Sequence, residues 1–240
     1  MRSRLIAAAL ALGVGCVPGM RATASPQQPR LIVAPTEGHP GDVIYLSGGG
    51  FPPHTRLDIR GGCGGRGSGS VLVSHGAAVA IPGPTTDGHG QFVAYNGLTF
   101  KGTPPSRCTV QASLPAGKAS GKTLASASYT VVAPGRPLGV CAAHMCLTVS
   151  AVLVRLTSGV QGNVAIKGWP GALAGVTVAR PGSKSEHMQI RLDWEGAATL
   201  RLKVAPGLRK GVAERVAVSA RLGRVTGSAS AHFVVVPGGR

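Results

Sequence analysis

The sequence contains an internal repeat of short, strand-like segments, and this repeat limits the folds open to the chain. Five segments of the first half recur in the same order in the second half, which is the pattern of a tandem duplication. The matched pairs are 41–48 with 162–168, 56–60 with 175–180, 90–94 with 196–200, 108–113 with 216–220, and 125–132 with 229–236. We therefore divide the chain into two tandem domains, residues 25–135 and 136–240, preceded by a leader of residues 1–24.

Each repeat has the residue pattern of β-strands separated by tight turns. Met188, Ile190, Leu192 and Trp194 alternate with polar residues, as expected of a strand with one face buried. The chain also has 37 glycines and 18 prolines, residues that favour turns, and no segment carries a sustained helical period. About seven short strands in roughly 100 residues are typical of an immunoglobulin-like sandwich. The fold class predicted is therefore all-β, with two tandem immunoglobulin-like β-sandwich domains.

The first 24 residues have the pattern of a secretory signal peptide. Arg2 and Arg4 precede an apolar run, and the small-x-small triplet at 22–24 predicts cleavage after Ala24. The apolar run is shorter than the roughly 18 residues that a membrane span needs, so we expect no transmembrane segment. Cys16 at the end of the run leaves a second hypothesis open, a lipoprotein acylated on that cysteine. Both hypotheses place the mature protein outside the cytoplasm.

Export determines how the cysteines are interpreted, because disulfides form and persist in oxidising compartments. Four cysteines follow the leader. Cys63 and Cys108 each alternate in step with apolar residues of their strand, so both side chains should point into the core, on strands that would lie side by side. We predict a disulfide between them, and a second, local one between Cys141 and Cys146. The alternative for the second pair is a soft-metal site, since His144 and Met145 lie between the cysteines and this donor set suits Cu(I).

Two stretches of the first domain resemble IPT/TIG-type and related bacterial Ig-like repeats. Residues 35–51 have a proline, a glycine-rich turn, a strand and then a Gly-x-Gly-Phe sequence, and residues 86–92 resemble the turn and strand of the same repeats. The second domain has Gly168-Trp169 where the first has Gly48-Gly49-Gly50-Phe51. The resemblance implies an Ig-like fold and a role as a spacer, an adhesion module or an accessory domain of an enzyme.

No motif in the sequence indicates catalysis. Residues 62–67 match GxGxxG, but a strand and not a helix follows them, so no helix N-terminus could receive a phosphate. No serine lies in a nucleophile elbow, no His-Glu-x-x-His occurs, and Asp42, Asp58 and Asp87 lie at turn or outward positions. We therefore expect a non-enzyme without a cofactor.

The aromatic residues fit a core better than a binding platform. Six of them fall at repeat-equivalent or inward positions, which leaves three others as candidates for exposure. The first set is Phe51, Phe92, Tyr129, Trp169, Trp194 and Phe233, and the second is Tyr45, Tyr95 and Phe100.

Positive charge is the remaining functional signal. The chain has 25 Lys and Arg against 8 Asp and Glu, and removal of residues 1–24 takes away three arginines and no acid, so the net charge falls from +17 to +14. Most of this charge lies in the second domain, on the parity opposite the apolar residues. We predict contacts with an anionic surface, as an alternative to a merely solvated one. The residues concerned are Arg191, Arg201, Lys203, Arg215 and Arg221.

The sequence thus indicates a secreted or surface-associated, non-catalytic Ig-like protein that acts as an adhesion, interaction or structural module at the bacterial envelope. Its expected partners are anionic envelope polymers or another surface protein, and not nucleic acid, because aromatic residues are sparse and the chain is exported. The alternative is an extracytoplasmic protein that binds a small ligand or a soft metal.

Overall fold

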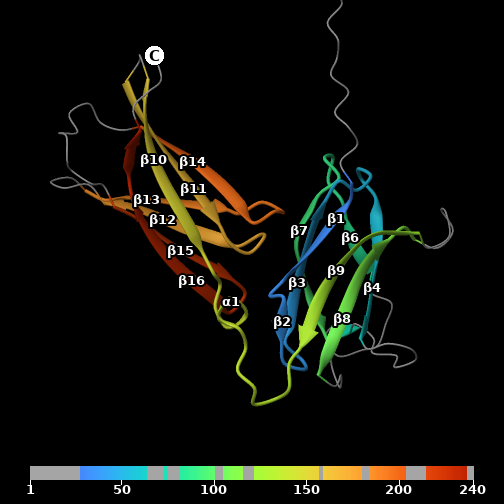
Figure 1. Cartoon of the computed structure of the whole chain (residues 1–240). Helices are drawn as coiled ribbons and strands as arrows, with labels where there is room; N and C mark the ends of the chain where they lie inside the picture. Colours follow the sequence, from blue (N-terminus) through green and yellow to red (C-terminus); the bar gives the residue numbers. More distant parts are fainter. Residues whose placement is uncertain are drawn as a thin grey trace, which may run out of the picture.

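The computed structural model describes residues 28–63, 73–74, 82–100, 105–115, 122–156, 159–179, 184–203 and 215–236. The predicted signal peptide, with Cys16, lies outside the described residues, as does most of the GxGxxG match. The described strands form four sheets in two sandwiches joined by residues 132–147, a segment that contains the short helix α1 (Val140–Ala143) (Figure 1).

The first sandwich packs a four-stranded sheet on a five-stranded one. The first sheet has the order β1-β3-β7-β5, comprising β1 (Arg30–Ala34), β3 (Val43–Gly49), β7 (Phe92–Thr99) and β5 (Val73–Ser74). The second has the order β2-β9-β8-β4-β6, comprising β2 (Glu37–Gly38), β9 (Thr123–Val131), β8 (Ser106–Ser113), β4 (Arg56–Cys63) and β6 (Pro82–Thr85).

The second sandwich repeats this plan with two four-stranded sheets. One has the order β14-β11-β10-β17, comprising β14 (Ala197–Lys203), β11 (Gly159–Lys167), β10 (Thr148–Leu156) and β17 (Val234–Val236). The other has the order β13-β12-β15-β16, comprising β13 (Glu186–Arg191), β12 (Leu173–Ala179), β15 (Arg215–Leu222) and β16 (Val225–His232).

The strand order identifies both bodies as immunoglobulin-like. In the first, β1 pairs with β3 and β3 with β7, while β4, β8 and β9 lie in the opposite sheet. In the second, β10 pairs with β11 and β11 with β14, while β12, β15 and β16 lie in the opposite sheet, as in Ig sandwiches. The prediction of an all-β chain of Ig-like sandwiches is confirmed. All five repeat pairs found in the sequence correspond to equivalent strands: β3 and β11, β4 and β12, β7 and β14, β8 and β15, and β9 and β16–β17.

The two sandwiches close one edge differently. In the first, the chain leaves β1 at Pro35, which has no N–H for the ladder, and β2 then pairs in parallel with β9. In the second, the last strand crosses between sheets instead, because β17 leaves β16 at Phe233 and pairs in parallel with β10.

The second and the last repeat segments have registers that the sequence alignment missed. In the second segment, Arg60 of β4 pairs with Gln111 and Gly175 of β12 pairs with Ser219, so Gly175 is equivalent to Arg60 and not to Arg56.

The last segment is shifted by two residues. Val110 of β8 pairs with Ala127, and Val218 of β15 pairs with Ala229, so Ala229 is equivalent to Ala127 and not to Ala125. A shift of two residues keeps every side chain on its face, and Phe233 is still buried, which is why alternation alone could not detect the shift.

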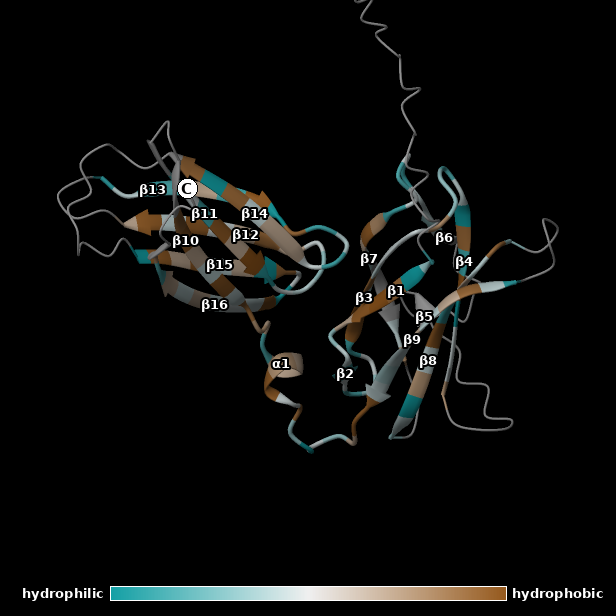
Figure 2. Cartoon of the chain, turned by 45° about the horizontal axis from the view of Figure 1, so that its top comes forward, coloured by the Kyte–Doolittle hydropathy of each residue, from teal (hydrophilic) through white to brown (hydrophobic). Residues whose placement is uncertain are grey.

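Each sandwich has its own apolar core, formed by alternate residues of its strands. Hydrophobic and less hydrophobic residues accordingly alternate along several strands (Figure 2). Ile44 and Leu46 of β3 are fully buried in the first core, and Val164 and Ile166 of β11 are their counterparts in the second. Tyr45 lies on the other face of β3, where it packs against the second core. This contact explains why Tyr45 is apolar on the outer parity of β3, whereas Val43 on the same parity is 45% exposed.

A matching turn precedes β7 and β14. The Asp87 carboxylate accepts backbone N–H bonds from residues 89 and 91 at 2.8 and 2.9 Å, and the Asp193 carboxylate accepts them from residues 195 and 197 at 2.9 and 2.8 Å. Gly90 and Gly196 close the two turns with φ of 72° and 77°. The two turns therefore share their hydrogen bonds and their backbone conformation, although the sequence similarity here is weak.

We expect Gly196→Ala to destabilise the second sandwich. A Cβ there would lie 2.1 Å from the Gly168 carbonyl oxygen, and the left-handed backbone alone costs a non-glycine residue about 1–3 kcal/mol. The control is Gly175→Ala on β12, where a Cβ would meet only Ser219 Oγ at 3.5 Å. Thermal unfolding followed by circular dichroism should show a lower midpoint for Gly196→Ala alone, and equal midpoints would contradict this account of the turn.

Candidate functional site

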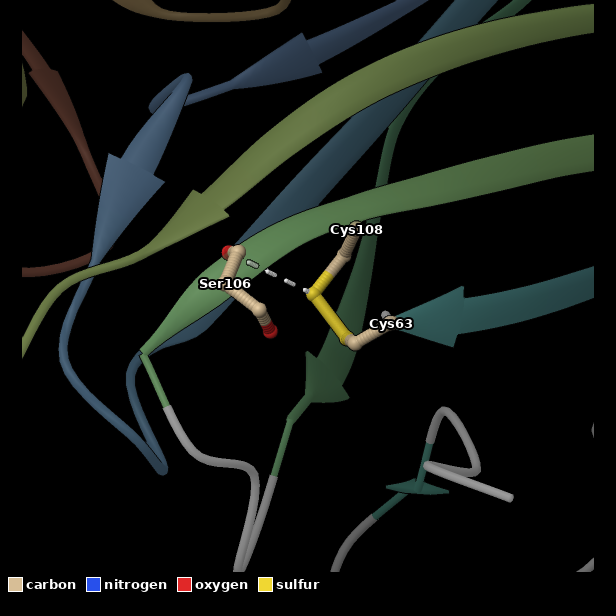
Figure 3. Close-up of a disulfide and its surroundings, with 3 residues drawn as sticks. All are labelled: Cys63, Ser106 and Cys108. Carbon is tan, nitrogen blue, oxygen red and sulfur yellow. Dashed lines mark hydrogen bonds between the residues drawn. A yellow bond between two sulfur atoms is a disulfide. The ribbon is translucent and has the colours of Figure 1, made fainter. Parts of the chain in front are cut away.

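The predicted disulfide of the first domain joins two neighbouring strands of one sheet. Cys63, the last residue of β4, pairs directly with Cys108 of β8, and their Cα atoms are 3.9 Å apart (Figure 3). Both side chains are buried at the edge of the first core, and the Ser106 carbonyl oxygen lies 4.0 Å from Cys108 Sγ. The bridge is therefore a cross-strand link within a sheet, and not a link between the two sheets.

The cysteines of the second pair also form a disulfide, Cys141–Cys146, across the helix α1. His144 between them is exposed, while Met145 is buried in the second core, so the structure does not bring these four side chains together as a set of metal ligands. In the part of the chain that is described, no group of three His, Cys, Asp or Glu side chains could hold a metal ion.

Two of the carboxylates considered for catalysis, those of Asp42 and Asp87, have structural roles in turns. Asp42 accepts a hydrogen bond from the His39 backbone N–H at 2.7 Å, in the turn before β3. The hydrogen bond from the Gln91 backbone N–H is the main cause that lowers the pKa of Asp87. Because the folded-state pKa is lowered, this contribution to stability is present at neutral pH and is lost as the pH falls through that pKa.

The two sandwiches contact each other outside their cores, at a site centred on Trp194. Trp194 follows Asp193 in the turn described above, belongs to neither core and is only 6% exposed. It packs against Gly49 of β3, where a Cβ would lie 2.5 Å from the indole. The next residue, Glu195, forms an ion pair with Arg30 of β1 at 3.5 Å.

Two further loops of the second sandwich contact the same outer face of the sheet β1-β3-β7 (Figure 1). A Cβ at Gly171 would lie 2.5 Å from Ala94 Cβ, and one at Gly223 would lie 2.0 Å from Tyr45 Oη. A bulge in β7 presents Ala94, which has a φ of 50°. Close backbone approach at residues 49, 171 and 223 therefore builds the interface.

The linker adds polar contacts beside this interface. The Gly139 backbone N–H donates to Glu37 Oε1 of β2, and His39 Nε2 lies 2.9 Å from the Arg136 carbonyl oxygen. These contacts hold residues 136–139 of the connection against the first sandwich and add to the packing that joins the two bodies.

The aromatic residues differ in part from the expectation. Phe100 is buried and stacks on Tyr129 at 5.4 Å between ring centroids, whereas the sequence left it as a candidate for exposure. Trp194 was assigned to a core and instead lies between the domains. The sequence signal for this contact was the run Gly48-Gly49-Gly50, because glycine inside a strand often marks the close approach of another segment.

The structure separates the basic residues predicted to contact an anionic surface. Arg191, Arg215 and Arg221 are exposed on the sheet β13-β12-β15-β16. Arg201 and Lys203 lie on β14 in the opposite sheet, and the Lys203 side chain is outside the described part of the chain. Three of the five therefore share one sheet, and the predicted set does not form a single patch.

Within the described ranges, no helix has the length and apolar character needed to cross a membrane.

No protein-family model and no curated protein sequence matches the chain. Among solved structures, it is similar to a tetra-tandem repeat from the extending region of a large adhesion protein, with 14% identity and a TM-score of 0.28 over 86% of this chain and 49% of that one. Red sea bream transglutaminase is 11% identical with a TM-score of 0.25, over 87% of this chain and 31% of the enzyme. A chimeric titin Z1Z2 tandem is 14% identical with a TM-score of 0.22, over 88% of this chain and 97% of the titin chain.

The chain spans about half the length of the adhesion-protein structure and about a third of the transglutaminase. Similarities with such low sequence identity and TM-score carry no information on activity. The assignment of the Ig-like fold rests on the strand order.

We expect Gly49→Val to separate the two sandwiches without unfolding either. The three nearest atoms to a Cβ at residue 49 all belong to Trp194, so the added side chain collides with the second sandwich and not with the first core. Small-angle scattering should give a larger radius of gyration for this variant, with unchanged circular dichroism. Gly62→Val, where a Cβ would meet nothing within 4 Å, is the matched control, and an unchanged radius for Gly49→Val would contradict the interface.

The two disulfides should contribute unequally to stability. Cys63–Cys108 closes a separation of 45 residues and Cys141–Cys146 one of 5, so loss of the first should cost about 4 kcal/mol and loss of the second about 2 kcal/mol in the chain-entropy model. Urea unfolding of Cys63→Ala/Cys108→Ala and of Cys141→Ala/Cys146→Ala would measure both. A larger loss for the second pair would contradict the ranking.

Proposed function

We propose that this chain is a secreted or surface-associated, non-catalytic protein that acts as an interaction or structural module at the bacterial envelope. The observation that carries the proposal is the docked pair of disulfide-containing sandwiches. Two disulfides suit an oxidising compartment, and an interface centred on Trp194 gives the pair a fixed geometry. A rigid pair of this kind can hold a binding face at a set orientation from a surface.

The signal peptide and the charge support the same proposal. Cleavage after Ala24 would release a mature protein of net charge +14, which favours attraction to anionic envelope polymers. We further propose that the first sandwich is of the IPT/TIG type, because the motif at residues 35–51 spans the crossing from β1 to β2 and the glycine-rich end of β3. The carboxylates of Asp42, Asp87 and Asp193 are engaged in turns, which supports a non-catalytic role.

Fractionation of the producing bacterium with intact-mass analysis tests the proposal. We expect a mature chain that starts at Ser25 and lacks four hydrogens through two disulfides, bound to isolated envelopes and released by salt. Salt should act because the screening length falls from about 8 Å at physiological ionic strength to about 3 Å at 1 M. A lipid on Cys16 would identify the lipoprotein form. A cytoplasmic chain with free thiols would overturn the proposal.

A further inference from the structure

The second sandwich carries a shallow groove on the outer face of the sheet β13-β12-β15-β16. One hollow of about 260 Å³ is lined by residues that include Leu173, Gly175, Ser219 and Arg221. A second hollow of about 300 Å³ shares Gly175 and Ser219 and extends the groove along the strands toward Thr177 and His187. The groove therefore follows the strand direction.

The floor of the groove is made of small and polar side chains set in register. Gln189, Gly175, Ser219 and Ser228 form one row across the four strands. The next row along is His187, Thr177, Ala217 and Ser230. Hydroxyl and amide groups thus line a trough whose depth comes from the missing side chain of Gly175.

Basic side chains stand at both ends of this trough. Arg191 and Arg221 flank Leu173 at one end, and Arg215 pairs with His232 at the other. The two arginines of β15 lie six positions apart, which is about 20 Å at the usual rise of a strand. Among the described residues, neither Arg215 nor Arg221 has an ion-pair partner, while Arg191 donates to the Gly171 carbonyl oxygen at 3.1 Å.

The equivalent face of the first sandwich carries different residues at the positions that form the groove. Arg60 of β4 pairs with Gln111, and at the equivalent place in the second sandwich Gly175 pairs with Ser219. The first sandwich therefore has an arginine side chain at the position that is open in the second. Asp58, which pairs with Ser113, likewise replaces Leu173 and puts an acid on that face. Arg107 of β8 is equivalent to Arg215, so the first face is also partly basic. Among the described residues, it is the open floor at Gly175 and the lack of an acid beside it that distinguish the second sandwich.

We propose that this groove binds an extended acidic polysaccharide. Carboxylate groups along such a chain would meet the guanidinium groups at the two ends, and its hydroxyl groups would hydrogen-bond to the serine, threonine and glutamine side chains between them. A lipid surface fits less well, because the face has a recessed polar floor. Nucleic acid fits less well because the described part of this face presents no Phe, Tyr or Trp side chain for base stacking.

This inference deepens the proposed function, on which it rests for an extracytoplasmic partner. The binding test uses purified protein, so its outcome does not depend on where the chain resides in the cell. Failure of the fractionation experiment and failure of this one are thus distinguishable.

The test measures binding to polygalacturonate, with its methyl-esterified form as the uncharged probe. We expect binding to polygalacturonate only, and an affinity about tenfold lower for Arg215→Gln/Arg221→Gln. The matched control is Lys167→Gln/Arg201→Gln, which removes two exposed charges from the other sheet of the same domain and should leave the affinity unchanged.

A second variant tests the groove apart from its charge. Gly175→Ile keeps every arginine and should fold, because a Cβ there makes only ordinary contacts and β-branched residues favour strands. We expect it to fill the trough and lower the affinity at least as much as loss of the two arginines. Unaltered binding by Gly175→Ile, or equal losses in both charge variants, would overturn the groove in favour of net charge alone.

Two further outcomes would also overturn the inference. One is binding to phosphatidylglycerol vesicles or single-stranded DNA in preference to polygalacturonate. The other is no binding of the unaltered protein either to polygalacturonate or to alginate, a second carboxylated polysaccharide.

Discussion

The relation between the two sandwiches depends on the packing of Trp194 against a strand position that has no side chain. Gly49 lets the indole approach the backbone of β3, and any larger residue there would occupy the same space. The Asp193 carboxylate fixes the turn that presents Trp194 and, next to it, the Glu195 carboxylate that pairs with Arg30. The interface therefore combines an apolar contact with a charged one from a single turn.

The duplication reused one turn for two purposes. Asp87 and Asp193 organise the same backbone geometry, and both turns end in a glycine with positive φ. In the first sandwich the two residues after the aspartate are Gly88 and His89, which are exposed, whereas in the second they are Trp194 and Glu195. The backbone of the turn is a requirement of the fold, and the two residues that it presents are free to build an interface.

The outer faces of the equivalent sheets β2-β9-β8-β4-β6 and β13-β12-β15-β16 also share a backbone arrangement and differ in the residues that they present. Both present serine and threonine on their last strand, but Arg60 and Asp58 occupy positions in the first sandwich that Gly175 and Leu173 occupy in the second. The repeated fold supplies the platform, and a few outward residues decide whether it is closed and of mixed charge or open and basic. Such positions can change without cost to the core, because they face away from it.

Residue type and alternation in the sequence determined the fold class, the five repeated strand pairs and the pairing of Cys63 with Cys108, and left Cys141 and Cys146 open between a disulfide and a metal site. These follow from local patterns: inward parity, turn residues and the spacing of the cysteines. Tertiary structure alone decided which residues meet across elements. It placed Trp194 between the domains, buried Phe100, and separated Arg201 from Arg191, Arg215 and Arg221. Parity tells which face of a strand a side chain takes, but not which sheet the strand joins or what covers that face, because both depend on contacts between distant segments.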